Sequence, residues 1–171
     1  SARVHVVYNG IDTGDYVDLG REDLDKTRMK FGLQAGFILS VGHLEARKNH
    51  CQLIKSLALL RDRGSNYNLV IVGHDSGEKK RLQQLIQALN LSEHVTLLSG
   101  LSDSDLIRLY GSARLFIFPS SYEGFGIPIL EAMASRCPMV LSNIPVFREI
   151  AQDSALYFDI DDPEDIASAI E

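Results

Sequence analysis

Short apolar runs alternate with longer amphipathic stretches along most of this 171-residue chain. Each run is rich in Val, Ile, Leu and Phe, and each ends near Gly, Ser or Pro. The runs do not alternate with polar residues, which is typical of parallel strands that are covered by helices on both faces. The pattern predicts strands at 37–41, 69–72, 95–98, 115–118, 139–142 and, from a weaker pattern, 155–158.

The stretches between the runs carry apolar residues three and four positions apart, as amphipathic helices do. Ser102, followed three residues later by Asp105, is typical of a helix start, and so is Pro163 in a first turn that is rich in acids. The predicted helices cover 48–63, 78–90, 103–112, 126–135 and a last one that begins at 162–165 and is cut off at Glu171.

Strands that alternate with helices predict an α/β fold, a doubly wound parallel sheet of the Rossmann-like kind. Such sheets bind ligands at the carboxyl ends of their strands, so candidate site residues should follow strands directly. Residues 12–30 are polar and charged and are interpreted as a surface connection. The loops to search are 42–48, 73–78, 99–103, 119–127 and 143–149.

The composition is that of one folded domain, with 45% hydrophobic and 23% charged residues. The net charge of −6 disfavours nucleic acid as the main partner, because that binding requires an excess of Lys and Arg. Cys51 and Cys137 lack metal-ligand spacing and are expected to be reduced thiols. No apolar stretch approaches the length of a membrane span, and a cytoplasmic location is expected.

The loop at 42–49 reads GHLEARKN and leads into a predicted helix. A helix start carries unpaired N–H groups, and basic side chains beside it can complete a site for a diphosphate. Arg47 and Lys48 are therefore candidate phosphate ligands. A solvated Arg-Lys pair on a surface loop explains this segment equally well when the loop is considered alone.

The loop at 119–128 reads PSSYEGFGIP, and its glycines can bring backbone N–H groups to an anion. Glu123 lies in this loop and Glu131 lies in the following helix, a separation that does not suit a glycosidase acid/base pair. Carboxylates accept hydrogen bonds from sugar hydroxyls, so both are candidate sugar ligands. A solvated acid at Glu131 is the alternative.

Other features have simpler explanations. The segment 73–77 reads GHDSG and is interpreted as a turn, because the chain has neither a GxGxxG nor a P-loop pattern. The acidic run at 159–165 suits a helix start, so no metal site is expected. The histidines at 5, 50 and 94 are interpreted as structural or exposed, and the role of His43 is open.

Together these segments resemble the C-terminal, donor-binding domain of GT-B glycosyltransferases of the group-1 type, called family 4. Residues 7–12 contain the NGID segment of the family, 42–49 resemble its G-x-L-E-x-R-K-N variant, and 123–131 match its pair of glutamates separated by seven residues. The resemblance covers nearly the whole chain. One departure is His43, which stands where many relatives carry Arg.

The resemblance implies transfer of a sugar from a nucleotide diphosphate sugar to an acceptor hydroxyl, with retention of configuration and no required metal or other cofactor. Arg47 and Lys48 would neutralise the diphosphate, Glu123 would face the donor sugar, and Glu131 would hold the ribose hydroxyls. The remaining residues that the resemblance assigns to donor binding are the backbone groups of Phe125, Gly126 and Ile127, Gly42 in the loop after the first strand, and Gly100 and Leu101 beside the base.

The resemblance also implies a second, N-terminal domain that binds the acceptor. Residues 1–30 would lead in from that domain, residues 31–171 would form the nucleotide-sugar-binding domain, and the chain alone would bind donor weakly and transfer little. The expected donor is GDP-mannose, and the expected acceptor is a glycan or a lipid-linked glycan in surface polysaccharide synthesis. The enzyme is expected to work at the inner face of the membrane. The alternatives are a sugar-nucleotide epimerase and a non-catalytic nucleotide-binding module.

Overall fold

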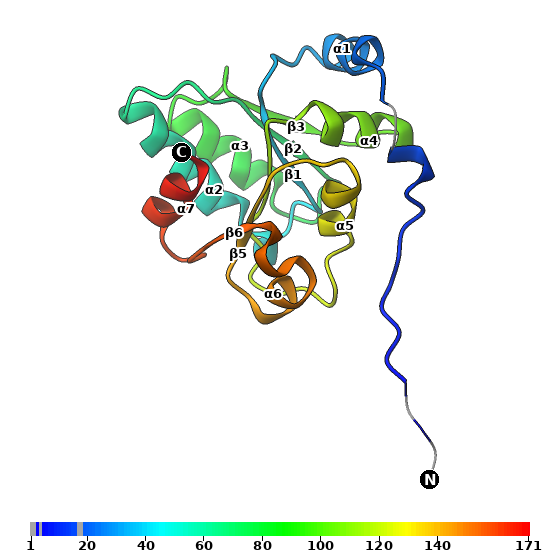
Figure 1. Cartoon of the computed structure of the whole chain (residues 1–171). Coiled ribbons are helices and arrows are strands. Elements are labelled where there is room, and N and C mark those ends of the chain that lie inside the picture. The colour runs from blue at the N-terminus through cyan, green and yellow to red at the C-terminus, as the bar shows by residue number, and fades with distance from the viewer. Residues whose placement is uncertain (1–2, 4, 17–18) are drawn as a thin grey trace.

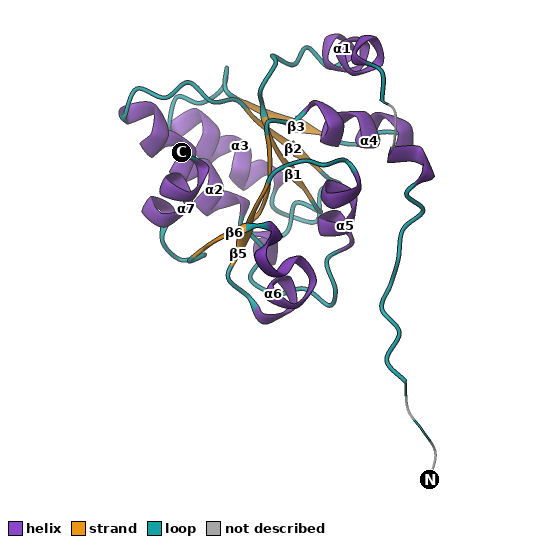
Figure 2. Ribbon diagram, viewed as in Figure 1, coloured by secondary structure: helices purple, strands orange, loops and turns teal. Residues whose placement is uncertain are grey.

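A six-stranded sheet lies between two layers of helices in the computed structural model, which describes residues 3, 5–16 and 19–171 (Figure 1). The strands form the orange centre of Figure 2, with helices on both sides. The strands are β1 (Ile38–Val41), β2 (Leu69–Val72), β3 (Val95–Leu98), β4 (Leu115–Phe118), β5 (Met139–Ser142) and β6 (Leu156–Phe158). The helices are α1 (Arg21–Lys30), α2 (His50–Asp62), α3 (Lys79–Ala88), α4 (Asp103–Ser112), α5 (Ile127–Ala134), α6 (Pro145–Ala151) and α7 (Pro163–Ile170), with 3₁₀ turns η1 (Gly14–Tyr16), η2 (Ala46–Lys48) and η3 (Gln152–Ser154).

All strand pairings are parallel, and the order across the sheet is β3-β2-β1-β4-β5-β6. The chain moves outward from β1 toward β3, and then returns to the other side of β1 and moves outward toward β6. The prediction of a doubly wound parallel sheet is therefore confirmed. The order reverses between β1 and β4, and in such sheets the crevice above the carboxyl ends of that strand pair is where ligands bind.

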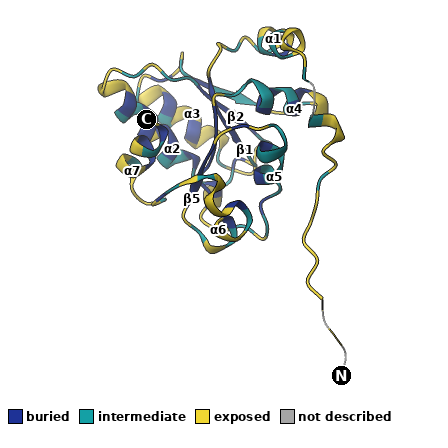
Figure 3. Cartoon of the chain, viewed as in Figure 1, coloured by how far each residue is buried: buried dark blue, intermediate teal, exposed yellow. Residues whose placement is uncertain are grey.

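The largely apolar strands are explained by a core on each face of the sheet. In β1, Ile38 packs with the residues of α2, α3 and α7, while Leu39 points to the opposite face, where α4, α5 and α6 lie. In β4, Leu115 and Phe116 divide in the same way. Because successive side chains point to opposite faces, a strand with two covered faces is apolar at nearly every position. The polar exceptions Ser40 of β1 and Ser142 of β5 are small and buried. Figure 3 shows this as a dark blue centre.

Two helices depart from the sequence-based expectation. The segment 12–30, interpreted as a surface connection, contains η1 and α1, and α1 packs against α4 with a 2.7 Å ion pair between Lys30 and Asp105. Only Thr27 of α1 is buried, so this helix has almost no apolar face to reveal it in the sequence. Helix α6 lies within a segment interpreted as a loop, because its seven residues are too few for a periodic pattern.

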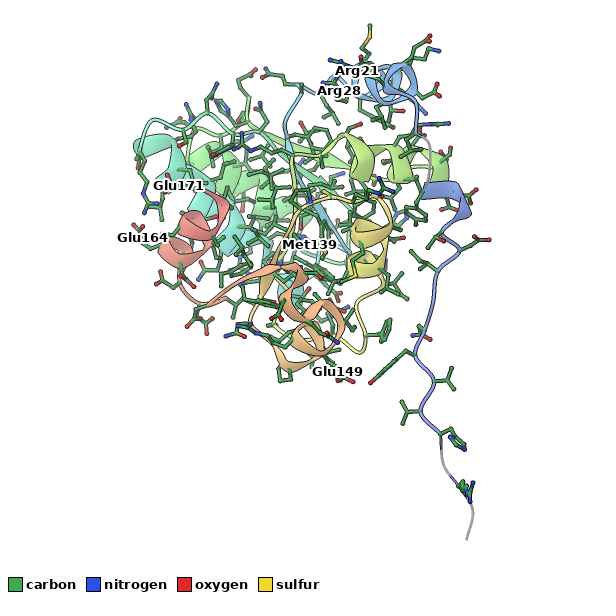
Figure 4. The ribbon with its side chains drawn as sticks, in the orientation of Figure 1. Arg21, Arg28, Met139, Glu149, Glu164 and Glu171 are labelled. Carbon is green, nitrogen blue, oxygen red and sulfur yellow. The ribbon has the colours of Figure 1, made fainter. Side chains whose placement is uncertain are left out.

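Residues 5–10, before η1, are extended and exposed (Figures 1 and 3). Val6 and Val7 are 80% and 89% exposed, but Tyr8 touches the domain. Its ring lies 6.0 Å from the ring of Phe125, and its hydroxyl donates a hydrogen bond to Glu149 of α6, which is labelled in Figure 4. Tyr8 therefore attaches this segment to the loop before α5. Within the described ranges, no helix combines the length and apolarity that crossing a membrane requires.

Candidate donor-binding site

The loops that follow β1 and β4 meet at the point where the strand order reverses. Ser121, in the loop after β4, donates hydrogen bonds from its backbone N–H and its hydroxyl to the carbonyl of Arg47, at 2.8 and 3.1 Å. Arg47 returns a hydrogen bond from its guanidinium to the Tyr122 carbonyl at 2.8 Å. Two segments that are about 75 residues apart thus form one structural unit at the carboxyl end of the sheet.

Three charged side chains converge where these loops meet. The Lys48 ammonium lies 2.5 Å from Glu123 Oε1, and the Arg47 guanidinium lies 2.9 Å from the same oxygen. Arg47 also pairs with Glu45 at 2.7 Å. The side chains of Lys48 and Glu123 are only 8% and 10% exposed, so this pair is shielded from solvent. The sequence placed these residues in two separate motifs, and the structure brings them together.

The fold creates the space that Lys48 occupies. A Cβ atom at Gly42 would lie 3.0 Å from Lys48 Cε, so Gly42 leaves room for the lysine stem. The ammonium sits 4.7 Å from the centre of the Phe118 ring at the end of β4, a cation–π arrangement. Phe118 is stacked on Phe147 of α6 at 5.0 Å. The aromatic core thus holds Lys48 in one position below the loop of Glu123.

Pairing with Lys48 and Arg47 decides the protonation state of Glu123. Burial of its carboxylate acts to raise the pKa, but the hydrogen bond and charge of Lys48 and the hydrogen bond from Arg47 outweigh burial, so the pKa lies below its ordinary value. Glu123 is therefore ionised at neutral pH. Arg carries five N–H donors and Lys three, so both cations can bind an incoming anion while they keep their contact with Glu123.

Helix α5 begins directly after this cluster. Gly126 precedes it with φ of +104°, a left-handed conformation that favours glycine, and an added Cβ would lie 3.1 Å from the ring of Phe147. Ile127 opens the helix, Pro128 has no N–H, and the Ile129 N–H donates to the Gly126 carbonyl at 2.9 Å. The Ile127 N–H has no partner within the helix. Phe125, which directly precedes Gly126, contacts the ring of Tyr8. A helix N-terminus next to Lys48 favours an anion at this position.

Glu131 lies one turn further into α5 and has a different environment. The hydroxyl of Tyr110, in α4, donates a 2.9 Å hydrogen bond to Glu131 Oε2, and the phenol of Tyr16 in η1 faces the same carboxylate. Burial raises the pKa of Glu131 and outweighs the Tyr110 hydrogen bond and the nearby Tyr16 phenol, which act to lower it. The two glutamates of the motif are thus held by different groups, cations at Glu123 and phenols at Glu131.

A cavity of about 190 Å³ opens above the ends of β1, β2 and β3. Gly42, Gly100 and Leu101, which the sequence assigned to nucleotide binding, all line it. His43 and His74 line it too, with their rings edge to face at 6.1 Å. Leucine and glycine backbone with two imidazoles form a surface that can pack against a flat heterocycle.

The turn predicted at 73–77 is present, and it has a further structural purpose. A Cβ at Gly73 would lie 1.9 Å from the Gly42 carbonyl oxygen, so the close approach that this glycine permits is that of protein backbone. The Asp75 side chain accepts hydrogen bonds from the N–H groups of Gly77 and Lys79, which closes the turn. Leu44 N–H donates to the His74 carbonyl, so this turn supports the loop of Lys48.

His50, two residues after Lys48, and the two cysteines form no ion pair with this cluster of charges. His50 is buried, and burial followed by the charge of Lys48 lowers its pKa to about 4, so it is a neutral core residue. Cys51 and Cys137 are free thiols. Among residues 3, 5–16 and 19–171, no group of three or more His, Cys, Asp and Glu side chains is arranged to hold a metal ion.

Sequence reasoning missed the residues that support the site from the core. Tyr110 and Phe118 fall at apolar positions of a helix and a strand and are indistinguishable from packing residues in the sequence. Tyr16 lies in a polar segment that has no clear pattern. Only the packing of α4 against α5 reveals that Tyr110 reaches Glu131.

Comparisons with known proteins agree with this architecture. The chain superposes on the crystal structure of Anabaena Alr3699/HepE in complex with UDP-glucose with a TM-score of 0.85 and 26% identity, over 97% of this chain and 46% of that one. It superposes on WaaG, a glycosyltransferase involved in lipopolysaccharide biosynthesis, with a TM-score of 0.76 and 23% identity, over 91% of this chain and 42% of that one. The fold is therefore that of one half of a GT-B glycosyltransferase.

Sequence comparison gives the family. The pattern described as "Glycosyl transferases group 1" matches residues 23–171, and the chain belongs to this family. It is 35% identical over 170 residues to the O-antigen chain mannosyltransferase RfbU of Salmonella typhimurium, covering 99% of this chain and 44% of that protein. It is 40% identical over 134 residues to the serotype-specific mannosyltransferase WbdA of Escherichia coli, covering 78% of this chain and 16% of that protein. The chain thus spans less than half the length of these relatives.

Proposed function

We propose that this chain is the donor-binding half of a retaining glycosyltransferase that transfers mannose from GDP-mannose to an acceptor hydroxyl. The observation that carries the proposal is the convergence of Lys48, Arg47 and Glu123 between the two loops at the strand-order reversal. The mannosyltransferases RfbU and WbdA, with which the chain shares 35% and 40% identity, support mannose as the sugar and surface polysaccharide as the product.

The proposed roles follow the charges of the site. Lys48 and Arg47 bind the diphosphate and stabilise the negative charge that develops on the leaving oxygen as the glycosidic bond breaks. The N–H groups at the start of α5, from Phe125, Gly126 and Ile127, assist them. Glu123, which is ionised, accepts hydrogen bonds from hydroxyls of the donor sugar. Neutralisation of the diphosphate by these side chains and by the helix start removes the need for a metal ion.

The nucleoside occupies the other half of the crevice. Glu131 accepts hydrogen bonds from the ribose hydroxyls, and the base packs against Gly100 and Leu101 in the cavity beside Gly42. His43 lines the same cavity, so its imidazole contacts the nucleoside and leaves the phosphates to Arg47 and Lys48.

The acceptor, a glycan or lipid-linked glycan, binds to a second domain that faces this crevice at the cytoplasmic side of the membrane. Residues 1–30 lead in from that domain, and 31–171 form the donor domain. Tyr8 fits this role, because its contacts with Phe125 and Glu149 place the lead-in segment beside the donor loop. Without the second domain, the chain binds donor but transfers little.

Calorimetric titration of the chain with GDP, UDP and their sugars tests the proposal. Lys48→Ala is expected to weaken GDP binding about 10- to 100-fold, the loss of a hydrogen bond to a charged group. Glu131→Ala should weaken it through the ribose. Lys55→Ala removes an exposed lysine from α2 and serves as the control. Failure of the wild-type chain to bind any of these nucleotides, or binding that neither variant changes, would contradict the assignment.

A further inference from the structure

Glu131 faces a specific arrangement of aromatic hydroxyls that its proposed role does not require. Tyr110 is 1% exposed and its hydroxyl reaches Glu131 Oε2 at 2.9 Å from another helix. Its ring packs against Phe116 of β4, with 5.3 Å between the ring centres. A phenol so enclosed has one available position, because tyrosine has only two side-chain torsions and the core fills the space around it.

A glutamate side chain alone does not have a fixed orientation. Its terminal torsion is broad, so a carboxylate on a helix surface rotates among many orientations. The hydrogen bond from an immobile phenol fixes Oε2 and with it the plane of the carboxylate. A carboxylate has about four acceptor positions, so the remaining ones stay available in a defined direction after Tyr110 takes one.

Tyr16 approaches the same carboxylate from the outside. It belongs to η1, before α1, is half-buried, and lines a cavity with Gly111 of α4 and Ala134 of α5, three residues after Glu131. Its phenol acts to lower the pKa of the Glu131 carboxylate. The two phenols come from different segments of the chain, Tyr110 from the buried face of α4 and Tyr16 from the half-buried η1.

We propose that Tyr110, assisted by Tyr16, is a positioning residue that orients the Glu131 carboxylate for the ribose hydroxyls and so makes the site selective for ribonucleotides. This inference rests on the proposed function, because it assumes that Glu131 binds the ribose. It adds that selectivity between ribose and deoxyribose depends on a tyrosine that does not touch the ligand.

The test compares the affinity for GDP with that for its 2′-deoxy and 3′-deoxy forms, measured by calorimetry on the chain. The wild type is expected to prefer GDP, and Tyr110→Phe to reduce the ribose preference about tenfold while affinity for the deoxy forms changes little. Tyr16→Phe should reduce the same ratio by a smaller factor, and its half-buried position makes it tolerant of the loss of a hydroxyl. Tyr67→Phe, which removes a hydroxyl near the start of β2, is the matched control.

A merely structural role for Tyr110 would lower the affinity for all three nucleotides together. In a Glu131→Ala background, Tyr110→Phe should change the ribose preference no further, because the carboxylate that it orients is gone. If the wild type prefers GDP and loses this preference in Glu131→Ala but keeps it in both tyrosine variants, the inference is overturned and the proposed function stands. If neither the wild type nor Glu131→Ala distinguishes the nucleotides, the proposed role of Glu131 fails.

Discussion

Replacing Lys48 by methionine tests most directly whether its ion pair with Glu123 stabilises the folded chain. Methionine keeps most of the length of the lysine stem beside Gly42 and Phe118, but removes the ammonium that lies 2.5 Å from Glu123. Glu123 then keeps only Arg47, at 2.9 Å. Breaking a fully buried pair by removal of one partner costs about 3–5 kcal/mol, and because Arg47 remains, we expect a loss of about 2 kcal/mol.

The assays are urea denaturation and thermal unfolding, each followed by circular dichroism at pH 7.5. For a chain of this size, about 2 kcal/mol corresponds to a fall in Tm of roughly 4–8 °C. The double variant Lys48→Met with Glu123→Gln should recover at least half of the loss, because the unpaired charge that causes it is gone. Lys55→Met, on the exposed face of α2, is the control and should be neutral.

The pH dependence gives an independent check. The pKa of Glu123 is depressed in the folded state, so its pairing contributes stability above the ordinary value of 4.5, and this stability is lost as the pH falls through the folded pKa. The difference between wild type and Lys48→Met should therefore shrink below pH 4.5. A Lys48→Met variant as stable as the wild type at pH 7.5, or one that Glu123→Gln does not rescue, would show that Lys48 does not stabilise the chain through the charge of Glu123.

Three further predictions concern single positions. Burial raises the pKa of Glu131, so its charged form destabilises the folded chain once the pH rises through that pKa. Glu131→Gln should therefore raise Tm at neutral pH, and this gain should vanish below pH 4.5, where the glutamate is protonated in both the folded and the unfolded chain. A lower Tm of the variant at pH 7.5 would contradict this. Gly73→Ala should destabilise the chain by more than about 3 kcal/mol in urea, since its Cβ would lie 1.9 Å from the Gly42 carbonyl, whereas Gly10→Ala meets nothing within 4 Å and should be neutral. Ser102→Ala should cost about 1 kcal/mol by the same assay, because its hydroxyl caps α4, and no change would show that the cap is dispensable.

The sheet could be predicted because its signal is local in the sequence. The strands are apolar at nearly every position, with Ser40, Thr96 and Ser142 as the exceptions, and each lies within about a residue of its expected bounds. The cap at Ser102 and the first-turn proline at Pro163 also act through residues a few positions away, and both are present. Helices α1 and α6 were missed for the same reason, since one has little apolar surface and the other is short.

The doubly wound fold, the family and the two motifs with Lys48 and Glu123 can be recognised from the sequence alone. Each motif is recognised from its residue types and their spacing within a short segment of the chain. The tertiary structure decided that both motifs meet over one oxygen, that Lys48 is buried on Phe118, and that Tyr110 reaches Glu131. These contacts join residues 21 to 76 positions apart, and only the packing of helices on the sheet brings such distant side chains within hydrogen-bonding distance.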